Sequence, residues 1–253
     1  MTIGIMIYFI TFFAALVQTT TGLGFGMIVA PFLLVFYPPI DAIQITGALT
    51  LLIAAVMTPF GFKNIVKEEL KNLAFGSAVG LILGTILLKF VPISSITISA
   101  FIVLSYAFYR FVESHLIARK KLPNRVNLTT DNGGALQYGL ASGLMGATLA
   151  MPGPMALIFL RKNGFNPEQV KATVFALMVA SYSAMLILSA AVSGVSDAAW
   201  LGLGMYLVPT SLGLLTGFNI SKYIPDFLFD LLNTCLMLSA ILVLGIKIVG
   251  MKF

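Results

Sequence analysis

Charged residues are scarce in this chain, which excludes the classes of protein that depend on them. Of its 253 residues, 9% are Asp, Glu, Lys or Arg, whereas soluble domains carry about 25%. Apolar residues reach 59%, and the mean hydropathy is +1.02. This composition excludes a soluble domain and predicts an integral membrane protein.

Cysteine and histidine are nearly absent, with Cys235 and His115 the single examples. One cysteine excludes an internal disulfide and any multi-cysteine metal site. No Asp or Glu falls near the middle of an apolar run, so neither a nucleophile with its base nor a pair of carboxylates is available at membrane depth. We therefore expect no enzyme activity, no cofactor and no bound metal.

Long apolar runs separated by charged or turn-forming residues predict about eight membrane spans. The runs cover residues 3–37, 42–62, 72–90, 95–115, 136–160, 170–192, 199–218 and 227–249. The first run is too long for one simple crossing, and periodicity leaves two interpretations open: a tilted, broken helix, or a span followed by a re-entrant piece. The predicted fold class is all-α, a polytopic transmembrane helix bundle.

The most polar segment, residues 118–134, divides the chain into two halves. We interpret it as a basic connecting loop between a first transmembrane repeat at 1–117 and a second at 135–253. Glycines and prolines carry the similarity: Gly22 matches Gly146, Pro39 matches Pro167, and Gly80 and Gly84 match Gly213 and Gly217. Four spans in each half imply a parallel repeat, whereas an odd number would imply an inverted one.

An interruption by glycine and proline occurs inside an apolar run once in each half. Residues 19–31 read TTTGLGFGMIVAP, and residues 143–154 read GLMGATLAMPGP. At membrane depth, unwound backbone is tolerated only against protein or a water-filled cavity, so we expect broken helices at the centre of the bundle. Paired interruptions in corresponding positions of two halves indicate the binding site of a transporter.

These features resemble the sulfite exporter TauE/SafE family of bacterial and archaeal membrane proteins. The resemblance rests on the Gly-x-Gly-x-Gly stretch that leads to a proline (Gly22 to Pro31), the second copy (Gly146 to Pro154), about eight spans and the basic central loop. It covers nearly the whole chain. It implies transport of small sulfur-containing anions such as sulfite, thiosulfate or sulfonates.

The residues around the interruptions suit an oxyanion. Backbone N–H groups at a helix N-terminus, which carries about half a positive charge, bind oxyanions without a charged side chain. Neutral hydroxyl and amide groups add further donors. The candidate substrate-binding residues are Gln18, Thr19, Thr20, Thr21, Gly22, Gly24, Gly26, Gln44, Thr46, Gly146, Thr148, Pro152, Gly153 and Thr173.

Other roles stay open for these residue types. Threonine hydroxyls in a membrane helix can bond back to their own backbone. Glycines spaced by four residues serve close helix packing, which is the role we predict for Gly76, Gly80, Gly84, Gly139, Gly143, Gly213 and Gly217. Gly22, Gly24 and Gly26 are spaced by two, which one packing stripe does not explain.

Most of the fifteen Lys and Arg residues cluster in short loops, as the positive-inside rule produces, and they do not imply nucleic-acid binding. Cytoplasmic termini place nine of the fifteen inside, but put Arg161, Lys162 and Lys171 outside. Either the bias is weak at that loop or the fifth segment does not fully cross. We expect a multi-pass protein of the cell membrane whose partners are the lipid bilayer and a small anion, with a homo-oligomer left open.

A channel, or a carrier for a different small solute or ion, is the alternative. A cation carrier would need carboxylates or many carbonyl ligands at the interruptions, and the acid-poor spans argue against that. An anion that leaves a cell with a negative interior gains about 2.3 kcal/mol per charge per 100 mV. Export or facilitated diffusion without a coupled proton is therefore the simpler hypothesis.

Overall fold

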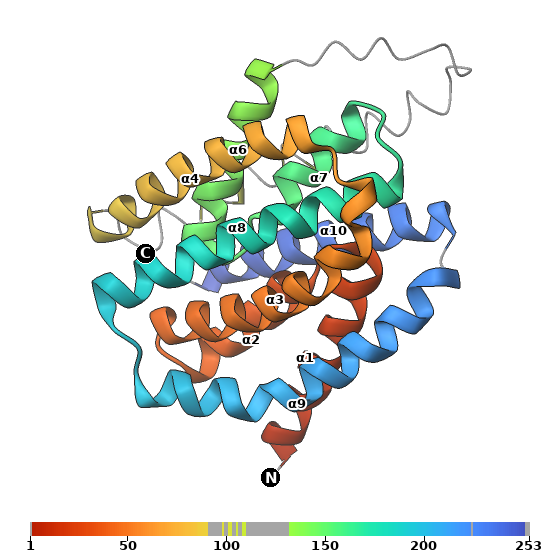
Figure 1. The fold of residues 1–253 in the computed structure, drawn as a ribbon. Helices are drawn as coiled ribbons and strands as arrows, with labels where there is room; N and C mark the ends of the chain where they lie inside the picture. Colours follow the sequence, from red (N-terminus) through yellow and green to blue (C-terminus); the bar gives the residue numbers. More distant parts are fainter. Residues whose placement is uncertain are drawn as a thin grey trace.

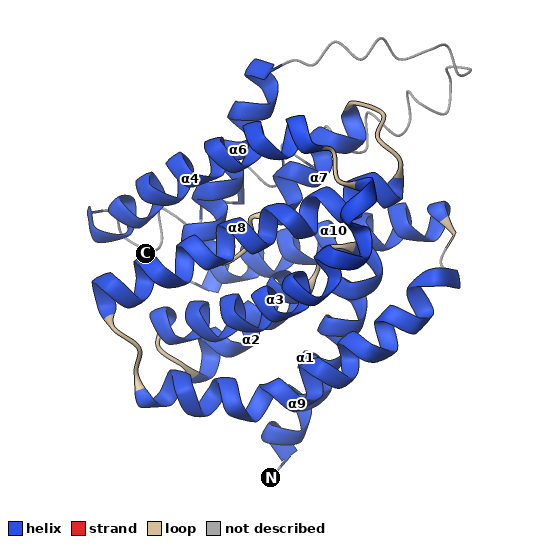
Figure 2. Ribbon diagram, in the orientation of Figure 1, coloured by secondary structure: helices blue, strands red, loops and turns tan. Residues whose placement is uncertain are grey.

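The computed structural model describes residues 2–90, 98, 101, 102, 105, 108, 109, 132–223 and 225–250, which form helices and the turns between them (Figures 1 and 2). The helices are α1 (Thr2–Thr21), α2 (Phe25–Phe36), α3 (Pro39–Gly61), α4 (Lys67–Phe90), α6 (Asn132–Leu149), α7 (Gly153–Lys162), α8 (Pro167–Ser193), α9 (Asp197–Ile220) and α10 (Asp226–Gly250). Short 3-10 helices, η1 (Phe62–Asn64) and η2 (Ser221–Tyr223), follow α3 and α9. The all-helical fold class is confirmed for this part of the chain.

Several of these helices have the length and apolar character of membrane spans. Four are sufficient to cross a bilayer: Pro39–Asn64, Lys67–Leu87, Pro167–Ser193 and Asp197–Ile220. Shorter apolar helices run over Met6–Thr21 and Phe25–Leu34. These helices support a multi-pass membrane protein. Most of the span expected at 95–115 and most of the connecting loop at 118–134 lie outside the described residues, so the count of eight stays a prediction.

The first interrupted segment folds back as a helical hairpin made of α1 and α2. Gly22 and Gly24 in its turn have φ values of 82° and 127°, which glycine adopts without strain. Tyr8 near the start of α1 and Tyr37 just after α2 both pack against Tyr206 of α9, with ring centroids 6.0 and 6.4 Å away. The two ends of the segment therefore lie together, which favours the re-entrant interpretation over a single broken crossing.

The second interrupted segment, α6 and α7, is a hairpin as well. The rings of Tyr138 and Phe159 lie 5.5 Å apart, whereas a straight helix would separate these residues by about 30 Å. Across the turn, the Ser142 hydroxyl donates a hydrogen bond to the Pro152 carbonyl. The expectation of one crossing over residues 136–160 was therefore wrong, because the chain reverses at its proline and glycine residues.

The two hairpins open toward opposite ends of the bundle. α3 and α8 lie side by side and antiparallel (Figure 1): Gln44 Nε2 is 2.8 Å from the Gly194 carbonyl at one end, and Asn64 Nδ2 is 3.3 Å from Glu168 Oε2 at the other. The first hairpin leads into the start of α3, near Gly194, and the second leads into the start of α8, near Glu168. We call the end at Glu168 the basic end, because its loops and helix ends carry Lys63, Lys67, Lys71, Arg161 and Lys162.

Glycines let the first helix of each hairpin pack closely on a helix of the other half. A Cβ atom added to Gly76 or Gly80 of α4 would collide with the α6 backbone, and one added to Gly139 or Gly143 would collide with that of α4. A Cβ atom added to Gly213 or Gly217 of α9 would collide with the carbonyl of Phe12 or Leu16 in α1. Gly84 of α4 faces Ala147 of α6. The predicted packing role of these glycines is confirmed.

Corresponding helices of the two halves run in opposite directions. α3 is antiparallel to α8, and α4 begins at the basic end, where α9 finishes with Phe218 packed 4.7 Å from Phe60. A hairpin returns to the side that it entered, so it adds no crossing, and each predicted half then has three crossings instead of four. An odd number of crossings implies that related halves would be inverted, not parallel. The relation between the halves itself stays a prediction based on their glycines and prolines.

Candidate functional site

The turns of the two hairpins meet in the interior of the bundle. A Cβ atom added to Gly26 would lie 2.5 Å from the Ala150 carbonyl oxygen, and one added to Gly153 would collide with the side chains of Leu23 and Met178. Glycine at both positions allows this close approach. The two interrupted segments, one from each half of the sequence, thus form one common centre.

A cavity of about 10 Å³ marks this centre. It is lined by Gln18, Leu23, Gly24, Gly26, Met27, Ala150, Met151, Gly153, Pro154, Met178 and Tyr182, all buried. That volume is about the minimum needed for one water molecule. The centre is therefore closed, and a solute can pass only when the hairpin turns separate.

Two polar side chains organise the centre. Gln18 Oε1 accepts a hydrogen bond from the Phe25 N–H (3.0 Å), so this side chain caps the start of α2 from across the turn. The only acceptor near its Nε2 in the described residues is Met178 Sδ at 3.9 Å, and thioether sulfur is a weak acceptor. The Tyr182 hydroxyl donates to the Ala150 carbonyl (2.6 Å) and holds the second turn in place.

The short helices α2 and α7 both begin at this centre and run outward to opposite ends. The first N–H groups of a helix lack intrahelical acceptors, and the helix dipole places partial positive charge there. Arg161 and Lys162 in the last turn of α7 complement the negative end of its dipole. None of the described residues that line the central cavity is acidic. The local electrostatics therefore favour an anion between the two turns.

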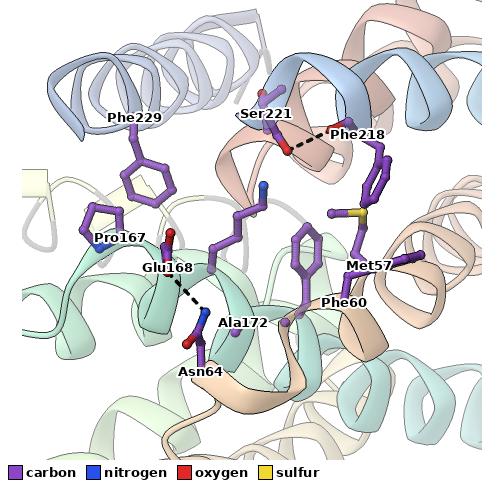
Figure 3. Close-up of a pocket in the computed structure, with 13 residues that line it drawn as sticks. Met57, Phe60, Asn64, Pro167, Glu168, Ala172, Phe218, Ser221 and Phe229 are labelled. Atoms are coloured by element: carbon purple, nitrogen blue, oxygen red, sulfur yellow. Dashed lines mark hydrogen bonds between the residues drawn. The ribbon is translucent and has the colours of Figure 1, made fainter. Parts of the chain in front are cut away.

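Two larger cavities lie on either side of the closed centre. The basic-end vestibule has a volume of about 370 Å³ (Figure 3) and is lined by Thr20, Met57, Phe60, Gly61, Asn64, Pro167, Glu168, Lys171, Ala172, Phe175, Phe218, Ser221 and Phe229. The opposite-end cavity, about 190 Å³, is lined by Gln44, Ile45, Ala48, Leu186, Ala190, Val195, Ala199, Trp200 and Leu203. The two cavities follow the same pair of helices, α3 and α8, from the two ends.

Comparison with known proteins identifies the family of this chain. A family model described as Sulfite exporter TauE/SafE matches residues 7–244, which include the turns of both hairpins. The chain belongs to the TauE/SafE family. No curated protein and no solved structure matches it significantly. Membership agrees with the apolar helices and assigns the chain to a group of membrane transport proteins.

In this TauE/SafE protein, some candidate residues lie at the centre and others beside it. Gln18, Gly24, Gly26 and Gly153 line the central cavity. Gly22 lies next to them in the first turn, and Pro152 immediately precedes α7 in the second. Gly146 and Thr148 remain inside α6, because the helix continues to Leu149 and breaks only at residues 150–152. Ala150, with a φ of 54°, takes the position in the second turn that Gly22 has in the first.

The threonines serve the TauE/SafE fold locally. Thr19, Thr20 and Thr21 donate to carbonyls of α1 at 2.7–2.9 Å, and Thr148 donates to Leu144 (2.8 Å). Thr173 Oγ1 accepts from the Val66 N–H (3.0 Å) and so anchors the turn before α4. These hydroxyl bonds match the alternative role for threonine in a membrane helix.

The two remaining candidates lie on α3, away from the hairpin turns. Gln44 donates to Ser189 (2.9 Å) and Gly194 (2.8 Å) and lines the opposite-end cavity. Thr46 is fully buried, and its hydroxyl has no partner among the described residues. The structure therefore places neither side chain in the lining of the centre.

Three residues that sequence reasoning missed also shape this TauE/SafE site. Tyr182 and Met178 contact the hairpin turns from the middle of α8, and Lys171 lines the basic-end vestibule one turn after α8 begins. A hydroxyl at the middle of a long apolar run was a signal for Tyr182. For Lys171 the signal was an ionisable residue just inside a span, which is expensive and normally functional.

Proposed function

We propose that the protein transports a small sulfur-containing oxyanion, such as sulfite, thiosulfate or a sulfonate, between the turns of its two hairpins. The observation that carries this proposal is the meeting of two helix N-termini, those of α2 and α7, at a buried centre with no acidic side chain among the described residues that line it. Two convergent positive helix ends and the Gln18 amide supply donors for oxyanion oxygens. Family membership supports sulfur anions as the class of substrate.

The closed centre supports a carrier over an open channel. Cavities of about 370 and 190 Å³ flank a central cavity of about 10 Å³. In this mechanism the turn of the first hairpin moves to admit the anion from the basic-end vestibule. The turn of the second hairpin then moves to release it toward the opposite end. Separation of one turn at a time exposes the bound anion to one end only.

We also propose that the basic end faces the cytoplasm. Lys63, Lys67, Lys71, Arg161 and Lys162 share this end, so the positive-inside rule no longer divides them between two sides. The described chain begins with α1 and finishes with α10 at the other end. This orientation places both termini outside the cytoplasm, opposite to the one expected from the loops, because each hairpin returns to the side that it entered.

Flux into proteoliposomes tests the proposed function. Purified protein would be assayed with ³⁵S-labelled sulfite, thiosulfate, taurine and sulfate and with ³⁶Cl-labelled chloride, with and without an imposed membrane potential or pH gradient. We expect saturable flux that prefers a sulfur anion and that is driven by a potential positive on the receiving side. Equal flux of all the anions, or no flux above protein-free liposomes, would overturn the proposal.

A further inference from the structure

The basic-end vestibule holds a charged side chain at the point where the first hairpin closes it. Lys171 belongs to the lining and lies one turn after the start of α8. A Cβ atom added to Gly22, in the hairpin turn, would lie 3.5 Å from both Cα and Cγ of Lys171. The lysine stem therefore packs directly on the turn that must move when the centre opens toward this end.

The polar lining of the vestibule is sparse and asymmetric. Among the described residues that line the vestibule, Lys171 is the only basic one and Glu168 is the only acidic one. Glu168 Oε2 accepts a hydrogen bond from Asn64 Nδ2 at 3.3 Å, which Figure 3 shows on one wall of the vestibule. A lysine ammonium has three donors and no acceptor, so it can offer donors to a bound oxyanion.

Apolar side chains surround this lysine. Met57, Phe60, Phe175, Phe218 and Phe229 form much of the lining, and Figure 3 shows Phe60, Phe218 and Phe229 around the cavity. Low-dielectric walls weaken the screening of a charge and focus its field into the space between them. The volume of about 370 Å³ is sufficient for a small hydrated oxyanion.

We propose that the basic-end vestibule is a loading site, in which Lys171 binds the transported oxyanion before the first hairpin opens. This inference rests on the proposed function and names a second position for the anion, outside the hairpin centre. The bound anion lies beside Gly22, so it is next to the turn that admits it. Glu168 opposes the anion and limits its affinity, which allows the anion to leave the vestibule.

Equilibrium binding of ³⁵S-sulfite to the purified protein and sulfite flux in proteoliposomes test this site with four variants. Lys171→Gln removes the charge, Lys171→Arg retains it, and Glu168→Gln removes the opposing carboxylate while keeping a partner for Asn64. Lys63→Gln is the matched control, because Lys63 is exposed at the same end but does not line the vestibule. Melting temperature in detergent reports on folding of each variant.

We expect Lys171→Gln to raise the Kd and the KM for sulfite about tenfold or more, as for loss of a hydrogen bond to a charged group. Lys171→Arg should retain most of the affinity, and Glu168→Gln should lower both constants. Lys63→Gln should change them less than twofold. A Kd that rises in Lys171→Gln and falls in Glu168→Gln cannot come from general loss of structure.

The inference and the proposed function fail in different ways. Sulfite flux with a KM that Lys171→Gln leaves unchanged, or loss of affinity in both Lys171→Gln and Glu168→Gln, would overturn the loading site and leave the proposed function intact. A wild-type protein that binds no sulfite would overturn the loading site. A protein that binds sulfite through Lys171 but gives no flux would overturn the proposed transport and leave the binding site.

Discussion

Substitution of Gly26 by alanine probes the contact between the hairpin turns. The new methyl group would lie 2.5 Å from the Ala150 carbonyl oxygen, so one of the two turns must shift by nearly an ångström. Its neighbour is backbone that Tyr182 holds by a hydrogen bond of 2.6 Å, not the end of a flexible side chain. The closed centre cannot absorb the methyl group without moving a hairpin.

The cost of this overpacking is about 1–3 kcal/mol. If it falls on the closed state alone, it shifts the equilibrium between closed and open centres by a factor of about 5–150. Gly204→Ala on α9 is the matched control, because an added Cβ atom there has nothing within 4 Å. That control makes the same chemical change without touching either hairpin.

A single cysteine at the centre reports this shift. Met151 lines the central cavity and is 6% exposed, so Met151→Cys in a Cys235→Ser background should react slowly with a methanethiosulfonate reagent. We expect Gly26→Ala to accelerate the reaction about 5–150-fold and Gly204→Ala to leave it unchanged. Equal labelling rates in the two folded variants would refute the account of the closed centre.

Two further substitutions test the polar groups at the centre. Gln18→Glu keeps an oxygen acceptor for the Phe25 N–H and places a negative charge where the anion binds. We therefore expect loss of sulfite flux with little change in melting temperature. Undiminished flux would exclude Gln18 from the pathway. Tyr182→Phe leaves the Ala150 carbonyl without its hydroxyl donor, at a cost of about 1–3 kcal/mol. We therefore expect the cysteine of Met151→Cys to be labelled faster in this variant. A labelling rate equal to that with Tyr182 in place would mean that the hydrogen bond does not hold the turn closed.

The positions of the interruptions could be predicted from the sequence, but the path of the chain through them could not. Glycine at 22 and 24 and proline at 152 and 154 mark places where a helix cannot continue easily. Whether the next helix continues across the membrane or turns back depends on tertiary contacts, such as those of Tyr8 and Tyr37 with Tyr206. Composition and periodicity do not predict those contacts.

Some residues of the candidate site could be predicted from the sequence and others could not. Residues whose role follows from backbone shape, such as Gly26 and Gly153, could be predicted, because a break needs residues that permit close approach. The threonine hydroxyls could bind the substrate or bond to their own helix, and the sequence does not distinguish these roles. In the structure they donate to nearby backbone carbonyls. Ala150 was not predictable as a turn residue, because alanine rarely adopts a positive φ.

The orientation of the chain depended on the hairpins as well. Counting each interrupted segment as one crossing placed Arg161 and Lys162 on the side opposite to Lys63. With two hairpins, the hydrogen bond between Asn64 and Glu168 brings these loops to one end. Labelling of cysteines introduced at Lys63 and next to Thr2 with an impermeant reagent in intact cells would separate the two orientations.

Hydrogen exchange at the backbone amides of the hairpin turns tests the central claim most directly, because the proposed donors are backbone N–H groups. Peptides that cover residues 22–28 and 150–158 would be followed by mass spectrometry in the presence of sulfite or of chloride at the same ionic strength. We predict that sulfite slows exchange in both peptides, with half-maximal protection near the KM for flux. Saturable sulfite flux without protection of either peptide would show that the anion passes elsewhere.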